Sequence, residues 1–117
     1  MNIDDLVKLW IEKFGREPIQ RPTLGRRSEV TIEIVHLPTA NTDRIRITNS
    51  MGTHVILTQI FHDQLFARWT ALKKEDNHLA TSKYALPSFT SDAGKIGTPY
   101  IPIIYRELDL VYRDLDL

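Results

Sequence analysis

Four arginines close together in the sequence are the side chains best suited to bind a ligand. They stand at positions 16, 21, 26 and 27, in a segment, 16–28, that is rich in proline and glycine and is predicted to be a loop. Between Lys13 and Arg27 the chain carries five basic residues and one acid, Glu17, within a protein of zero net charge. Because guanidinium groups match the geometry of phosphate oxygens, this loop predicts contacts with a nucleic-acid backbone.

A predicted strand extends this basic surface. Residues 44–48 alternate as Arg-Ile-Arg-Ile-Thr, which places Arg44 and Arg46 on one strand face. The opposing interpretation is that the arginines form ion pairs with acids near them in the sequence, and both interpretations stay open. Those acids are Glu17, Glu29, Glu33 and Asp43. The expected nucleic-acid contacts are Arg16, Arg21, Arg26, Arg27, Arg44, Arg46 and Lys95.

The histidines do not form a metal-binding pattern. Ligands on one helix or strand must share a face at short spacing, and no histidine stands in that relation to another. Glu29 and Glu33 do share a strand face, and a metal-dependent nuclease or hydrolase could use them with a histidine, which is a weaker third hypothesis. The histidines are His36, His54, His62 and His78.

Signatures of nucleotide binding and nucleophilic catalysis are incomplete. The sequence Ala-Gly-Lys-Ile-Gly-Thr at 93–98 lacks the first glycine of a phosphate-binding loop, and Ile96 stands where a serine or threonine would hold magnesium. There is no Gly-x-Ser-x-Gly motif, and the absence of cysteine removes thiolate nucleophiles and zinc sites. We therefore predict a non-enzymatic binding module with no catalytic residue, metal or cofactor.

The C-terminal segment offers a second kind of binding surface. Six of its last ten residues are leucine, valine or tyrosine, which is unusual for a free terminus. A protein-interaction or homodimerisation module is therefore the alternative function. The expected interface residues are Tyr100, Ile104, Leu108 and Tyr112.

The composition predicts one folded domain, residues 1–117. A hydrophobic content of 42% is sufficient for a single core. The zero net charge provides no global field toward polyanions or membranes, so a nucleic acid would have to meet a local patch. The first residues are acidic where a secretory signal would be basic, and no apolar run approaches the about eighteen residues of a membrane span. We expect a cytoplasmic protein without a membrane partner.

The first half of the chain shows clear periodicity. Apolar residues at helical spacing predict a helix over 3–14, with Asn2 as its N-cap and Gly15 at its end. Alternating apolar and polar residues then predict three short strands. These strands cover residues 30–36, 44–48 and 54–57, and their short connecting turns require an antiparallel meander.

A long amphipathic helix is predicted next, capped by Thr58 and running to about residue 75. The same periodicity places His62 on its outward side. The apolar face comprises Phe61, Leu65, Trp69 and Leu72, with Phe66 beside it.

The end of the chain is less regular. Residues 77–97 lack sustained periodicity, which predicts an irregular loop, a lid or a short hidden helix. The next segment is either a helix that begins at Thr98 or, because of Pro102, an edge strand over 100–105. The predicted fold class is α+β: a helix, a three-stranded antiparallel meander, a long helix, an irregular loop and a C-terminal helix or edge strand.

Overall fold

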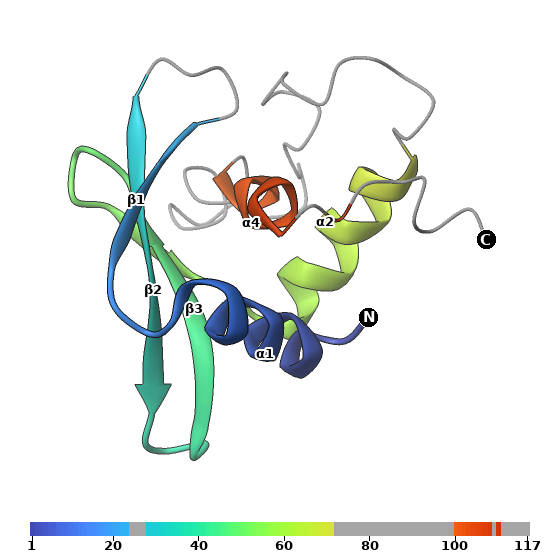
Figure 1. The fold of residues 1–117 in the computed structure, drawn as a ribbon. Helices are drawn as coiled ribbons and strands as arrows, with labels where there is room; N and C mark the ends of the chain where they lie inside the picture. Colours follow the sequence, from blue (N-terminus) through green and yellow to red (C-terminus); the bar gives the residue numbers. More distant parts are fainter. Residues whose placement is uncertain (24–27, 72–99, 109, 111–117) are drawn as a thin grey trace.

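Helices and an antiparallel sheet make up the part of the protein that can be described, which confirms the expected α+β class (Figure 1). The structure is a computed structural model that describes residues 1–23, 28–71, 100–108 and 110. In chain order its elements are α1 (Ile3–Phe14), β1 (Ile19–Pro22), β2 (Glu29–Leu37), β3 (Thr42–Thr48), β4 (His54–Ile56), α2 (Gln59–Ala71) and α4 (Pro102–Glu107).

The sheet has the strand order β1-β2-β3-β4, and every neighbouring pair is antiparallel. The three predicted strands are therefore confirmed as a meander. Ile32 stands opposite Ile47 and Ile34 opposite Ile45, so these isoleucines share the face that joins the core. The intervening residues share the other face, which we call the outer face. The strict alternation of strand side chains explains why sequence identified both faces.

β1 corrects the sequence prediction, because segment 16–28 was expected to be only a loop. Ile19 pairs with Ile32 on β2 and extends the same apolar face. The pairing is prolonged by Arg16, whose carbonyl accepts from the N–H of Ile34 at 3.3 Å. Pro22 ends the strand at an edge of the sheet, a position that tolerates a residue without an N–H. Hydrogen bonds to the edge of β2 stabilise this strand. The residues of β1 alone do not indicate that this edge is available for pairing.

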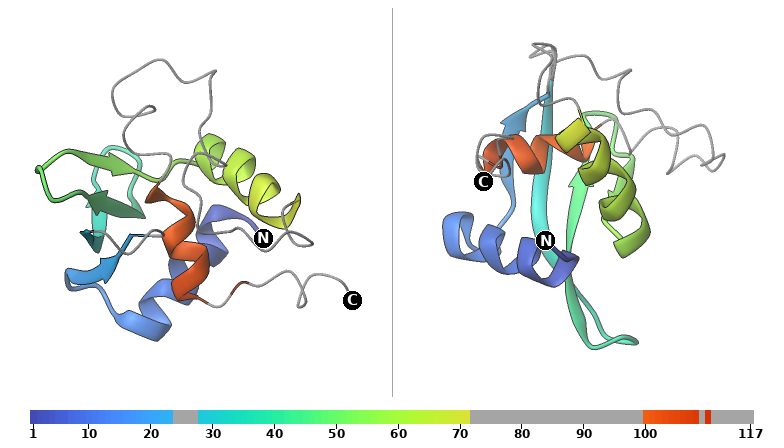
Figure 2. Two further views of the ribbon diagram at one scale, coloured as in Figure 1. Left: turned by 90° about the horizontal axis from the view of Figure 1, so that it is seen from above. Right: turned by 90° about the vertical axis from the view of Figure 1, so that its right-hand side faces the viewer.

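The three described helices, α1, α2 and α4, lie on one face of the sheet (Figures 1 and 2). The hairpin of β2 and β3 extends past α1, as the lower part of Figure 1 shows. Apolar side chains from the sheet and all three helices meet between these layers and form the core. Its most deeply buried large members are Trp10, Tyr105, Ile3, Leu6, Ile32, Ile45, Ile47, Leu57, Leu65 and Ile101.

The predicted helix ends have the expected capping contacts. The side chain of Asn2 accepts from the N–H of Asp5 at 2.8 Å, and Gly15 has a φ of +80°, a conformation that favours glycine. The hydroxyl of Thr58 accepts from the N–H of Phe61 at 3.3 Å at the start of α2. These contacts satisfy backbone groups that a helix end leaves without a partner.

His62 corrects the expected orientation of α2. The sequence prediction placed it outward, but the structure buries it completely together with Leu65 and Trp69. Positions 62, 65 and 69 are three and four residues apart, so they share one helical face. Phe61, which was expected to lead that face, is only half-buried. The predicted extension of this helix toward residue 75, including Leu72, lies outside the described residues.

The C-terminal segment is a helix and not an edge strand. Pro102 is the first residue of α4, where its fixed φ and missing N–H suit the first turn. The predicted start at Thr98 and the irregular segment 77–97 lie outside the described residues. Within the described helices, none is long and apolar enough to cross a membrane.

Candidate functional site: a basic rim along α1, β1 and α4

Four of the seven expected nucleic-acid contacts can be placed in the structure. Arg16 follows α1, Arg21 lies in β1, and Arg44 and Arg46 lie in β3. The other three, Arg26, Arg27 and Lys95, lie outside the described residues.

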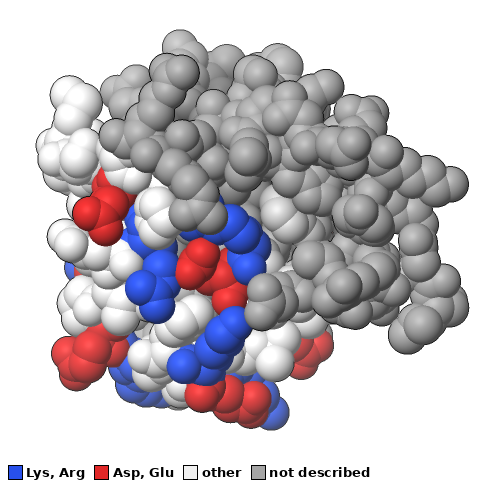
Figure 3. Space-filling model, turned by 45° about the horizontal axis from the view of Figure 1, so that its top comes forward, with Lys and Arg blue, Asp and Glu red and all other residues white. Residues whose placement is uncertain are grey.

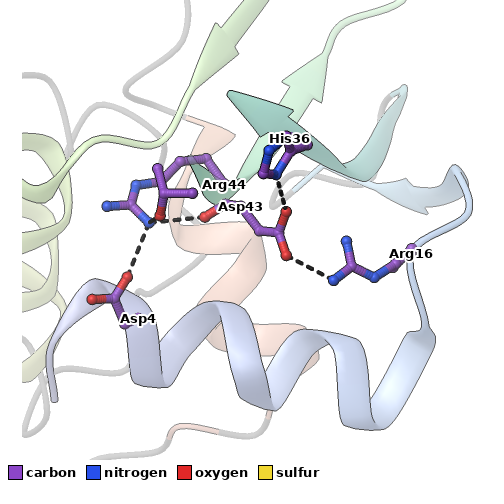
Figure 4. A network of polar contacts seen from close by, with 6 residues as sticks. Asp4, Arg16, His36, Asp43 and Arg44 are labelled. Atoms are coloured by element: carbon purple, nitrogen blue, oxygen red, sulfur yellow. Dashed lines mark hydrogen bonds and ion pairs between the residues drawn. The ribbon is translucent and has the colours of Figure 1, made fainter. Parts of the chain in front are cut away.

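The two arginines of β3 are held by neighbouring oxygen atoms. Arg46 faces Glu33 across the β2–β3 pair, and its Nη2 donates to Glu33 Oε1 at 3.0 Å. Nη1 of Arg44 donates to Asp4 Oδ1 at 3.0 Å and to the carbonyl of Asp43 at 2.8 Å. The guanidinium of Arg44 therefore points toward α1 and joins it to β3, as Figure 4 shows. Because these contacts occupy both arginines, they act first as structural ties between elements.

Asp43 holds Arg16 and His36 beside one another (Figure 4). Arg16 Nη2 donates to Asp43 Oδ2 at 2.7 Å, and His36 Nδ1 lies 3.0 Å from Asp43 Oδ1. The bond from Arg16, followed by the bond from His36, lowers the pKa of Asp43 to about 2. The same bond raises the pKa of Arg16. The side chains of Arg16 and His36 are 57% and 52% exposed, so both remain accessible to a ligand.

Glu107, at the end of α4, is a second point of convergence that the sequence did not reveal. Its Oε2 accepts from Arg106 Nε at 2.9 Å, and its Oε1 lies 2.8 Å from Arg21 Nε. Its backbone carbonyl accepts from Lys13 Nζ at 2.7 Å. Two basic side chains, from β1 and α4, thus meet one carboxylate, and Lys13 of α1 binds the backbone carbonyl of the same residue. We call Lys13, Arg16, Arg21 and Arg106 the basic rim.

Contacts with the backbone and with an aromatic ring fix the position of this rim. The guanidinium of Arg106 donates to the carbonyls of Pro22 and Thr23, beside the end of β1. The guanidinium of Arg21 lies 5.1 Å from the ring centroid of Phe14, a cation–π distance. These contacts order the cationic groups in advance, which lowers the entropy that binding must overcome.

Acidic side chains are interspersed with the basic ones on the surface drawn in Figure 3. The interpretation that the arginines pair with acids is therefore correct for Arg16, Arg21, Arg44 and Arg46. Of the acids proposed as partners, Asp43 and Glu33 have that role. Arg44 pairs instead with Asp4, and Arg21 pairs with Glu107. These two acids are distant in the sequence from the arginines, so no local pattern could identify them.

The residues of the expected protein interface are distributed differently. Ile104 is completely buried in the core, and Tyr100 is half-buried. Leu108 lines an open groove of about 300 Å³ with Leu9, Glu12 and Lys13, between α1 and the end of α4. The fourth expected residue, Tyr112, lies outside the described residues.

Within the described ranges, no group of three or more histidine, aspartate or glutamate side chains is placed to hold a metal ion. Glu29 and Glu33 share the outer face as expected, and Glu33 is paired with Arg46. Comparison with known protein families, with curated proteins and with solved structures found no match for this chain.

Proposed function

We propose that the protein is a binding module that contacts the phosphate backbone of nucleic acid through the basic rim. The observation that carries this proposal is that Arg21 and Arg106 share the single carboxylate of Glu107. One carboxylate cannot neutralise two guanidinium groups. The positive charge that remains attracts phosphate groups and releases their counterions on binding.

The exposure of Arg16 adds a second group to this surface. Its guanidinium has five N–H donors, and the bond from Nη2 to Asp43 leaves the more than half-exposed group able to meet a phosphate oxygen. His36 presents a further polar group next to it, on the same carboxylate. Phosphate contacts position a protein on nucleic acid without reading its sequence, so we expect weak sequence preference.

The side chains on the outer face of the sheet favour contacts with the phosphate backbone of nucleic acid over stacking of its bases. Single-strand binding sheets stack bases on exposed aromatic rings. The strands β1 to β4 contain no phenylalanine, tyrosine or tryptophan. The outer face instead carries threonines, aliphatic residues and the Glu33–Arg46 pair. We therefore expect duplex and single strands to bind through charge, and not through stacked bases.

Fluorescence anisotropy with labelled duplex and single-stranded oligonucleotides tests the proposal. We expect binding at about 50 mM salt that weakens steeply as salt rises. The variant Arg16→Gln should lower the slope of log affinity against log salt by about 0.9 for duplex DNA, the value for one lost phosphate contact.

The matched control is Lys8→Gln, which removes one positive charge from an exposed position of α1. If Lys8→Gln reduces the slope as much as Arg16→Gln, only the total charge matters and the rim is not a site. Absence of binding by the unmodified protein at about 50 mM salt would refute the function itself.

Homodimerisation is a second candidate, and the groove between α1 and α4 favours it. Leu9 and Leu108 give this groove an apolar lining, and Glu12 and Lys13 provide opposite charges at its side. Light scattering should then show a dimer that Leu9→Glu dissociates. The control is Ile60→Glu, on an exposed position of α2. A monomer at all concentrations, or equal effects of the two variants, would exclude this candidate.

A further inference from the structure

The imidazole of His62 joins three segments that are distant in the sequence. It belongs to α2, and its Nε2 lies 3.0 Å from the carbonyl oxygen of Met1, just before α1. Its Nδ1 lies 2.9 Å from the hydroxyl of Tyr105 on α4. The ring also stacks on Phe66, with centroids 5.3 Å apart. Both nitrogens of the fully buried imidazole therefore have partners, and the aromatic rings of Phe66 and Tyr105 lie beside it.

The partners determine the protonation state of this ring. A carbonyl oxygen only accepts hydrogen bonds, so Nε2 must carry the proton that is donated to Met1. The neutral ring then has an unprotonated Nδ1, which accepts from the Tyr105 hydroxyl. Burial raises the pKa of Tyr105 far above its usual range, so this hydroxyl remains a donor. The neutral form of His62 thus satisfies both ring nitrogens and the Tyr105 hydroxyl.

A second proton disturbs this arrangement. Nδ1 then becomes a donor, so the Tyr105 hydroxyl must accept from it and redirect its own proton. The available acceptor is the carbonyl of His62, at a longer distance of 3.3 Å. A positive ring is also left in an apolar cluster, and an unsolvated charge is costly there. The folded junction consequently favours the neutral ring.

The groups that face His62 do not reverse this preference. Burial lowers the pKa of His62, and this effect exceeds the opposing hydrogen bond to Met1 and the attraction of Asp63. Asp63, the charged neighbour on α2, is exposed to water and accepts a hydrogen bond from Gln59. The positive charge of the Met1 amino group also lowers the pKa of His62. The Tyr105 hydroxyl from α4 is neutral.

We propose that His62 is a proton-sensitive latch that holds the N-terminal end of α1 and α4 against α2, and that acidification opens this junction while the sheet remains folded. The opening exposes His62 to water, where it takes the second proton without penalty. The contacts of His62 described above are to Met1, Tyr105 and Phe66, none of which lies in a strand, so the backbone ladders of β2 and β3 are not part of the latch. Release of the latch therefore separates the helices locally and leaves β2 and β3 paired.

Hydrogen exchange followed by NMR tests the latch on the intact chain. After correction for intrinsic exchange rates, protection of amides in α2 and α4 should fall by about tenfold per pH unit as the pH drops below the usual pKa of histidine. Amides in β2 and β3 should keep their protection over the same range. The variant His62→Gln can donate to Met1 and accept from Tyr105 but cannot titrate, so it should abolish the pH dependence.

His54→Gln is the matched control, since His54 is exposed on β4, and it should leave the pH dependence unchanged. A pH dependence that persists in His62→Gln would overturn the proposal. Should that variant fail to fold, the imidazole resonances of the unmodified protein decide. The latch requires that His62 gain its second proton only together with the loss of α2 protection. Titration of His62 in the usual range while α2 and α4 stay protected would refute it.

Discussion

The carboxylate of Glu107 is predicted to stabilise the fold while it weakens nucleic-acid binding. The variant Glu107→Gln keeps the size of the side chain and one acceptor oxygen, but it removes the charge opposite Arg21 and Arg106. We expect the free energy of unfolding to fall and the affinity for nucleic acid to rise. A substitution that only disrupted the fold would lower both.

The contacts of Glu107 set the size of the stability loss. The bond from Arg106 joins two side chains that are each 18% exposed, and a charge-assisted bond in such a setting contributes about 1.5–3 kcal/mol. Arg21 is 36% exposed, and its Nε–H does not point at the nearby oxygen, so this pair adds at most about 1 kcal/mol. Since the glutamine oxygen retains part of the Arg106 bond, we expect a net loss of about 2 kcal/mol.

Urea and thermal unfolding measure this loss. For 117 residues, an unfolding entropy of about 2.1 cal/mol/K per residue converts about 2 kcal/mol into a decrease in Tm of about 8 °C. The control is Glu12→Gln, the same chemical change at an exposed position of α1, and it should stay within about 0.5 kcal/mol of the unmodified protein. Equal stabilities of the two variants would refute the role of Glu107 in holding α4 on β1. Reduced nucleic-acid affinity in Glu107→Gln would refute its opposition to the basic rim.

Three further predictions concern stability. Asn2→Ala should lower the free energy of unfolding by about 1 kcal/mol in urea titrations, since it removes the cap of α1; an unchanged midpoint would contradict that capping role. Trp69→Phe should cost about 1 kcal/mol more than Trp10→Phe. The Nε1 of Trp69 donates to a backbone carbonyl, whereas that of Trp10 is buried without a partner among the described residues. Similar losses in the free energy of unfolding for the two variants would show that this hydrogen bond does not contribute. The low folded pKa of Asp43, about 2 against an ordinary 3.8, means that its bond with Arg16 stabilises the fold above about pH 4 and that this contribution is lost as the pH falls through about 2. Asp43→Asn should therefore flatten the acid-unfolding profile in that window, and a profile parallel to that of the unmodified protein would count against the linkage.

Short-range patterns account for what could be predicted from sequence. The helix over 3–14 was identified because apolar spacing and the Asn2 cap are both local signals. The faces of β2 and β3 were identified because a period of two leaves no other arrangement once one face is buried. The arginines could also be identified from the sequence as the candidate binding residues, because the charge of a residue follows from its type.

Only the tertiary structure decided where those side chains find their partners. β1 forms because the edge of β2 accepts it, and Glu107 meets Arg21 because α4 packs beside that strand. His62 turned inward because Met1 and Tyr105, from opposite ends of the chain, supply its two hydrogen-bond partners. Hydrogen bonds and ion pairs act over a few ångströms of space regardless of sequence separation. The sequence by itself therefore determined α1, the strands β2 to β4 and the buried faces of α1, β2 and β3. Folding determined the strand β1, which charges are neutralised and which histidine is buried.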